Sequence, residues 1–144
     1  MAKYNNKKVV VDDITFDSKD EALYYIYLKE QKQLGNVLEF SVQPKFTLLK
    51  AYEKYGKKVR AMTYSPDFYI KYPDGKEEYI DVKGMSTQAS EMRRKLFDYF
   101  YKDLTLRWVS RNLKHGDEHG WIDYDDLKKV RAENRKKLKQ TKAK

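Results

Sequence analysis

The stretch Y-S-P-D-F-Y-I-K-Y-P-D-G-K-E-E-Y-I-D-V-K-G, residues 64–84, decides the fold because it holds two strand-like runs joined by a tight turn. Tyr-Pro-Asp-Gly places proline second in a type I turn and glycine where the backbone needs a positive φ, which is typical of a three-residue hairpin loop. With Pro-Asp-Gly as that loop, Tyr72 lies opposite Lys76, and counting back places Asp67 opposite Asp81. A two-residue loop would shift the register and put the two carboxylates on opposite faces.

Asp67 and Asp81 form an unfavourable pair in this register. Directly opposed side chains have Cβ atoms about 5 Å apart, and at an effective dielectric constant near 20 two like charges at that distance repel by about 3 kcal/mol. Lys83 shares the face of Asp81, because alternate residues of a strand point the same way, so it offsets one charge in part. A divalent cation would relieve the repulsion fully.

Carboxylate oxygens in a chain without cysteine favour Mg²⁺ or Mn²⁺ over zinc. A metal ion held by Asp67 and Asp81 beside Lys83 would suit phosphodiester hydrolysis. The alternative is a solvent-facing hairpin with ordinary surface charges.

The net charge is concentrated at one end of the chain. The 144 residues carry a formal charge of +9, and residues 128–144 contain nine Lys or Arg against one acid. The other 127 residues therefore carry 22 basic and 21 acidic side chains, a net charge of +1. A basic segment on a balanced body is typical of a protein with a negatively charged partner, most often nucleic acid. A solubilising tail is the alternative.

Length and hydropathy bound the class of protein. We expect one domain with a single core over residues 1–127, followed by a basic C-terminal helix or tail over 128–144. No apolar run approaches the length of a membrane span, and the first residues lack an apolar signal segment. We therefore expect no membrane partner and a cytoplasmic location.

Patterns outside the hairpin predict a mixed α/β fold. Strand 104–110 follows a helix, so it can return to the sheet parallel to its neighbour. In chain order we expect a hairpin over 9–16, a helix from Ser18 to about Gly35, an extended segment over 37–50 interrupted by Pro44, strands over 59–72 and 77–83, a helix over 86–102, strand 104–110 and a last helix capped by Asp123.

Glu21 has two interpretations. It follows Ser18 in the spacing S-x-x-E, which is the pattern of a capping box in which the carboxylate reaches back to the Ser18 N–H. Alternatively, its carboxylate belongs to the same site as Asp67 and Asp81.

Taken together, P-D at 66–67 and D-V-K at 81–83 resemble the active-site signature of the PD-(D/E)xK nucleases. The order of elements over roughly residues 14–110 resembles the restriction-endonuclease-like core. That resemblance implies a central, mainly antiparallel, mixed sheet of four to five strands flanked by helices. The segments I-T-F-D-S-K-D-E-A, Q-P-K-F-T-L, Y-S-P-D-F-Y-I and D-V-K-G are similar to small phage-encoded nucleases related to junction-resolving endonucleases.

The resemblance implies a set of functional residues. Glu21, Asp67 and Asp81 are expected to bind Mg²⁺ or Mn²⁺, and Lys83 to act as the catalytic base on the attacking water. Gln43 and Lys95 occupy positions where such enzymes often keep polar residues near the site. Arg93, Arg94 and Lys95 form a basic run on the expected helix 86–102 that is close enough in sequence to the site to contact DNA phosphates, and a solvated helix face is the alternative.

The function implied is a metal-dependent DNA endonuclease, and the nearest similarity favours a phage-type Holliday junction resolvase. Such an enzyme would act on branched DNA as a homodimer, in the cytoplasm of a bacterial host. Two alternatives stay open: a restriction-like or packaging-associated nuclease on linear DNA, and a non-catalytic DNA-binding module whose basic tail supplies the affinity.

Overall fold

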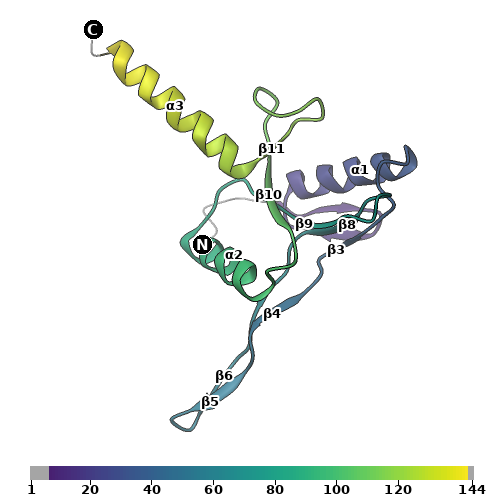
Figure 1. Ribbon diagram of the computed structural model, residues 1–144, viewed down its shortest axis with the longest axis vertical. Helices are drawn as coiled ribbons and strands as arrows, with labels where there is room; N and C mark the ends of the chain where they lie inside the picture. The colour runs from purple at the N-terminus through teal and green to yellow at the C-terminus, as the bar shows by residue number, and fades with distance from the viewer. Residues whose placement is uncertain (1–6, 143–144) are drawn as a thin grey trace.

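The computed structural model describes residues 7–142. The helices are α1 (Lys19–Gln33), α2 (Gln88–Phe100) and α3 (Tyr124–Lys142). The strands are β1 (Val9–Val11), β2 (Ile14–Phe16), β3 (Glu39–Val42), β4 (Phe46–Leu49), β5 (Tyr52–Lys54), β6 (Lys57–Val59), β7 (Met62–Tyr64), β8 (Phe68–Lys71), β9 (Glu77–Val82), β10 (Leu106–Arg111) and β11 (Trp121–Asp123). The expectation of a mixed α and β fold is confirmed (Figure 1).

A five-stranded sheet in the order β11-β10-β9-β8-β3 forms the centre. The β9–β10 pair is parallel and the other three pairs are antiparallel, so the sheet is mixed and mainly antiparallel, as expected. The parallel pair follows from the connection through α2, because a crossover is needed to bring the chain back in the same direction.

The β8–β9 hairpin has the register expected from its turn. Phe68 lies opposite Ile80 in this pair, and continuing by one residue places Asp67 opposite Asp81. Gly75 has a φ of 90°, in the region that a side chain makes costly, so glycine is required at this point of the turn.

The expected strand 59–72 is wrong in its extent. The run is divided into β7 and β8, which pair with different partners: β7 with β4, and β8 with β3 and β9. The division falls at Ser65 and Pro66, and proline has no N–H to continue a ladder. Between the expected segments 37–50 and 59–72 the chain forms a hairpin of two short strands, β5 and β6.

Two further details differ from expectation at the C-terminal side. Strand β11 was not expected, since three residues acquire strand structure only by pairing with β10. Asp123 lies directly before α3, but its carboxylate accepts a hydrogen bond from Arg107 at 2.7 Å. Helix α3 runs without a break through Leu127 and Lys128.

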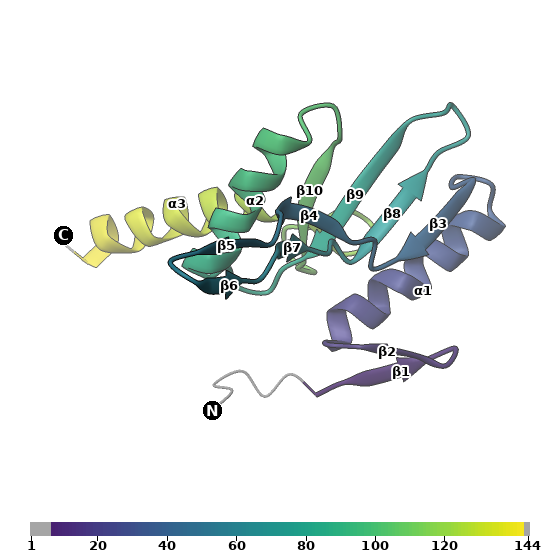
Figure 2. The ribbon, with the colours of Figure 1, turned by 90° about the horizontal axis from the view of Figure 1, so that it is seen from below.

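Buried side chains form two clusters among residues 7–142, not the single core expected. The larger lies between α1 and the sheet and includes Phe68, Ile70 and Ile80. The smaller joins Tyr64 of β7 to Phe97 of α2. Alternate residues of β9 therefore point to different clusters, and Asp81 leaves the sheet on the face opposite to Ile80. Figure 2 shows α1 and α2 on the two sides of the sheet.

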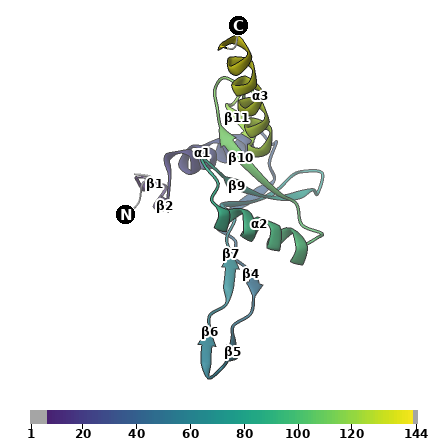
Figure 3. The same cartoon turned by 90° about the vertical axis from the view of Figure 1, so that its left-hand side faces the viewer.

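Two elements project from the body. The β5–β6 hairpin extends at one end of the long axis and α3 at the other, as Figures 1 and 3 show. None of the helices in the described part of the chain has both the length and the apolar character needed to cross a bilayer.

Candidate active site

The structure brings the four expected catalytic residues together in one cleft with a volume of about 440 Å³. Glu21 comes from the first turn of α1, Asp67 directly precedes β8, Asp81 lies in β9 and Lys83 follows it. The residues lining the cleft are Asp17, Glu21, Thr63, Tyr64, Ser65, Asp67, Asp81, Val82, Lys83, Ser90 and Arg93.

Asp67 is fixed by the main chain of the neighbouring strand. Its Oδ2 accepts a hydrogen bond from the Val82 N–H at 2.7 Å. The pKa of Asp67 is raised well above its usual value, first by burial of the carboxyl group and then by the negative charge of Asp81. Glu21 adds a smaller contribution in the same direction. The repulsion expected across the hairpin is therefore present in the fold.

Asp81 is buried and is held by two donors. Its Oδ2 accepts a hydrogen bond from the Tyr64 hydroxyl and lies 3.4 Å from the Lys83 ammonium. Trp108 donates its indole N–H to the Tyr64 oxygen at 3.2 Å, which fixes the hydroxyl proton toward the carboxylate. Asp81 is thus oriented by a chain of donors that begins on β10.

Lys83 lies between Asp81 and an aromatic ring. Its Nζ is 4.9 Å from the centre of the Trp108 ring, and its side chain is one-fifth exposed. A cation is stabilised over the face of a Trp ring. The ammonium is therefore held close to both the carboxylate and the opening of the cleft.

Only half of the expected capping box forms at Glu21, since no bond from its carboxylate to the Ser18 N–H is found among the described residues. The Ser18 hydroxyl caps α1 by accepting the Glu21 N–H at 3.2 Å. The Glu21 carboxyl group nevertheless lines the cleft. Burial raises its pKa to about 7, the charge of Asp17 adds to this and Asp81 contributes less. The backbone N–H of Asp17 and the Ser18 side chain offset the increase in part.

The other expected polar residues lie in different surroundings. Arg93 is exposed and lines the carboxylate cleft, whereas Arg94 and Lys95 line a separate cavity between α2, β10 and α3. Gln43 is exposed, has a φ of 52°, and donates its N–H to the carbonyl of Asp67 at 2.9 Å. Gln43 therefore supports the main chain at Asp67 and lies outside the residues that line the cleft.

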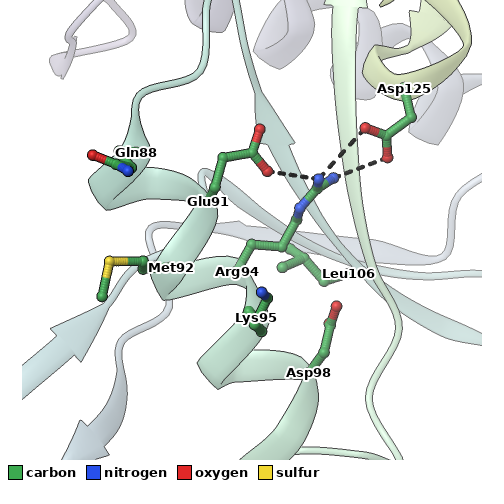
Figure 4. A pocket seen from close by; sticks show the side chains of 8 residues that line it. All are labelled: Gln88, Glu91, Met92, Arg94, Lys95, Asp98, Leu106 and Asp125. Atoms are coloured by element: carbon green, nitrogen blue, oxygen red, sulfur yellow. Dashed lines mark hydrogen bonds and ion pairs between the residues drawn. The ribbon is translucent and has the colours of Figure 1, made fainter. Parts of the chain in front are cut away.

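Arg94 joins α2 to the start of α3, as Figure 4 shows. Its guanidinium donates to Glu91 at 2.8 Å and to Asp125 at 3.0 Å. It also lies over the Trp108 ring, which the Lys83 ammonium approaches too, with 3.9 Å between the guanidinium carbon and the ring centre. These contacts occupy the guanidinium with protein groups.

The carboxylates fit a hard divalent cation by their chemistry. Asp67 and Glu21 both have raised pKa values because negative charges are crowded in a buried place, and a divalent cation would favour their ionised forms. Among residues 7–142 there is no preformed group of three or more His, Asp or Glu side chains arranged to hold a metal ion.

A family model described as "Protein of unknown function (DUF1064)" matches residues 1–117. The chain belongs to the DUF1064 family. Glu21, Asp67, Asp81 and Lys83 all fall in the matched part of this DUF1064 chain, and α3 lies outside it. No curated protein and no solved structure matches it.

Sequence reasoning missed Asp17 and Tyr64, which line the cleft of this DUF1064 protein, and Trp108, which contacts Tyr64 and Lys83 from behind it. Tyr64 directly precedes S-P-D, but no local pattern indicates that β7 pairs outside the central sheet and turns this side chain toward Asp81. Trp108 lies opposite Asp81 in the parallel β9–β10 pair, and the register of a parallel pair cannot be read from a turn. Asp17 was recognisable only as an acid beside the helix cap.

Proposed function

We propose that this protein is a metal-dependent nuclease that hydrolyses phosphodiester bonds in DNA. The observation that carries the proposal is the opposition of Asp67 and Asp81 across β8–β9, with Glu21 and Lys83 in the same cleft. This is the residue set that resembles the PD-(D/E)xK signature, brought together by elements that are far apart in the sequence.

In this proposal the acidic side chains bind the metal ion and the lysine acts on the water. Asp67, held by the Val82 N–H, and Asp81, held by Tyr64, present carboxylates in fixed positions, and Glu21 completes the set of oxygen donors. Mg²⁺ or Mn²⁺ bound by these groups would supply Lewis-acid stabilisation of the charge on the phosphate oxygens. Lys83 is placed to act on the attacking water and to neutralise charge that develops on the phosphate.

Branched DNA is the substrate that the family resemblance favours, with a homodimer making two symmetric cuts. Linear DNA is the competing substrate. Cleavage of a labelled four-way junction and of a matched duplex, each with Mg²⁺, Mn²⁺ or a chelator, separates the two. A resolvase cuts the junction in preference to the duplex, and only with a metal ion.

The roles of the residues are tested by substitution. We expect Asp81→Asn and Lys83→Ala to lower the cleavage rate by on the order of a hundredfold or more, since each removes a charge that acts in the transition state. Asp103→Asn and Lys114→Ala, two exposed positions outside the cleft, serve as matched controls and should cleave at the original rate. Equal rates for all four variants would contradict the proposal and favour a non-catalytic DNA-binding module.

A further inference from the structure

Residues 50–60, which contain β5 and β6, form a projecting arm (Figures 1 and 3). All of them except Val59 are exposed. The arm contains five basic residues and one acid, a net charge of +4, in the order Lys50, Glu53, Lys54, Lys57, Lys58 and Arg60. An exposed ribbon with this charge favours binding to a partner of opposite charge.

The arm holds positive charge that hides a negative net charge on the rest of residues 1–127. Removing its five bases and one acid from the 22 bases and 21 acids of residues 1–127 leaves 17 bases and 20 acids, a net charge of −3. The body that holds the carboxylate cleft is therefore negative. The excess positive charge is concentrated on the arm and on residues 128–144, at opposite ends of the long axis (Figure 3).

One face of the arm is basic and aromatic and contains no acid. Lys54 lies opposite Lys57, and Tyr52 lies opposite Val59, so these four side chains share a face. Like charges directly opposed across a strand pair are destabilising. None of the ion pairs among the described residues includes an arm residue, so the protein itself leaves this repulsion in place.

The tip carries a large aromatic side chain in a strained position. Tyr55 has a φ of 54° and is 88% exposed, and Lys54 Nζ lies 5.1 Å from its ring centre. With Gly56 at a φ of 71°, the two form a turn with both central residues at positive φ, which favours Asn-Gly. The exposed ring gains little packing within the protein that would offset this backbone strain, which makes Tyr55 a candidate contact for a partner.

We propose that the arm binds duplex DNA by entering its major groove beside the site of cleavage. A two-stranded ribbon fits a groove about 12 Å wide, and the phosphates on its edges would neutralise Lys54 and Lys57. The position of the DNA relative to the cleft rests on the proposed nuclease function; binding by the arm does not. The ribbon continues from the arm through β4 and β7 to Tyr64, which contacts Asp81, so DNA held by the arm runs toward the carboxylates.

Binding of a labelled duplex in a chelator tests the arm without cleavage. Replacing Lys54, Lys57 and Lys58 by Gln should weaken binding by about tenfold or more and lower the salt-dependence slope by about 2 to 3, since each lost phosphate contact contributes about 0.9. The matched control replaces Lys19, Lys32 and Lys114, three exposed lysines of the body, and should bind as the original protein does.

Tyr55→Asn separates binding from folding. Asparagine suits the turn better than tyrosine, so the melting temperature should stay the same or rise, while the affinity for DNA should fall about threefold to tenfold if the ring contacts DNA. Methyl green, which occupies the major groove, should displace the protein, and the minor-groove ligand netropsin should not.

The outcomes distinguish this inference from the proposed function. Unchanged duplex binding by the triple-lysine variant overturns the arm inference whether or not the protein cleaves DNA. Binding to anionic vesicles that depends on the arm lysines, with no such dependence for duplex DNA, also overturns it, because a membrane surface would then be the partner. Binding that depends on the arm, in a protein that cleaves no DNA with Mg²⁺ or Mn²⁺, supports the arm inference and refutes only the nuclease proposal.

Discussion

Glu21 is the residue where folding and proposed chemistry conflict most directly. Its N–H is used by the Ser18 cap, which stabilises α1, while its carboxyl group is drawn into a cleft that already holds Asp67 and Asp81. Burial raises the pKa of Glu21 to about 7, above its ordinary 4.5. The fold therefore tolerates this side chain most easily in its neutral form.

The pH dependence of stability should show this conflict. Between about pH 4.5 and 7 the folded state holds a proton on Glu21 that the unfolded chain has lost, so the free energy of unfolding should fall as the pH rises through this window. The raised pKa of Asp67 acts in the same direction. Urea titrations in a chelator should show a shallower fall for Glu21→Gln than for the original protein.

The exposed Glu30 of the same helix provides the control for this measurement. Glu30→Gln should follow the pH profile of the original protein. Parallel profiles for Glu21→Gln and the original protein would mean that the Glu21 carboxyl group is not destabilised by its surroundings.

The opposition of Asp67 and Asp81 could be predicted from the sequence because the hairpin that pairs them is local, and its Pro-Asp-Gly loop fixes the register. The positions of Tyr64 and Trp108 beside Asp81 could not be predicted, because they depend on contacts between distant segments: β7 with β4, and β9 with β10. No turn sets those registers.

At the scale of elements, the same distinction explains which parts of the fold were predictable. The β1–β2 hairpin, α1 and the β8–β9 hairpin follow from local turns, caps and periodicity, and all three form as expected. The division of 59–72 into β7 and β8 was missed because a run of residues that favour strands does not reveal a change of partner strand. Its one local sign is Pro66.

Gly75 tests the importance of the hairpin turn. Gly75 has a φ of 90°, and no atom lies within 4 Å of the position of an added Cβ. Gly75→Ala therefore destabilises the protein only through the strained backbone conformation that alanine would have to adopt. We expect the free energy of unfolding to fall by about 1–2 kcal/mol. Gly84→Ala is the matched control, because its added Cβ also has open space and its φ is not in the positive region, and it should change stability much less. Equal losses for both variants would show that backbone strain at the turn is not the cause.

At the scale of the whole molecule, charge is separated along the long axis. The cleft is acidic and lies on the body, whereas α3 presents almost only basic and polar side chains beyond Leu127. Acidic residues in the first turn of α3 and Lys139 and Lys142 in its last turn complement the helix dipole. The helix can therefore project without packing along its length.

Neutralising the far part of α3 should weaken DNA binding in a salt-dependent way. Replacing Arg135, Lys136, Lys137 and Lys139 by Gln keeps good helix formers at exposed positions. If all four contact phosphates, the slope of log affinity against log salt concentration should fall by about 3 to 4. Asn134→Ala with Gln140→Ala, on the same helix and without a charge change, should leave the slope as it was; an unchanged slope in the charge variant would remove α3 from the binding surface.

The arm leaves the body and returns to it at a single place, since β4 and β7 are hydrogen-bonded neighbours there. Residue pairs can therefore be inserted or removed between them without altering the spacing of Asp67, Asp81 and Lys83. During evolution, the length of the ribbon is free to diverge between relatives while the carboxylate cleft stays the same. In a laboratory chimera, the ribbon of one relative could be exchanged for that of another by joining the chains at this point.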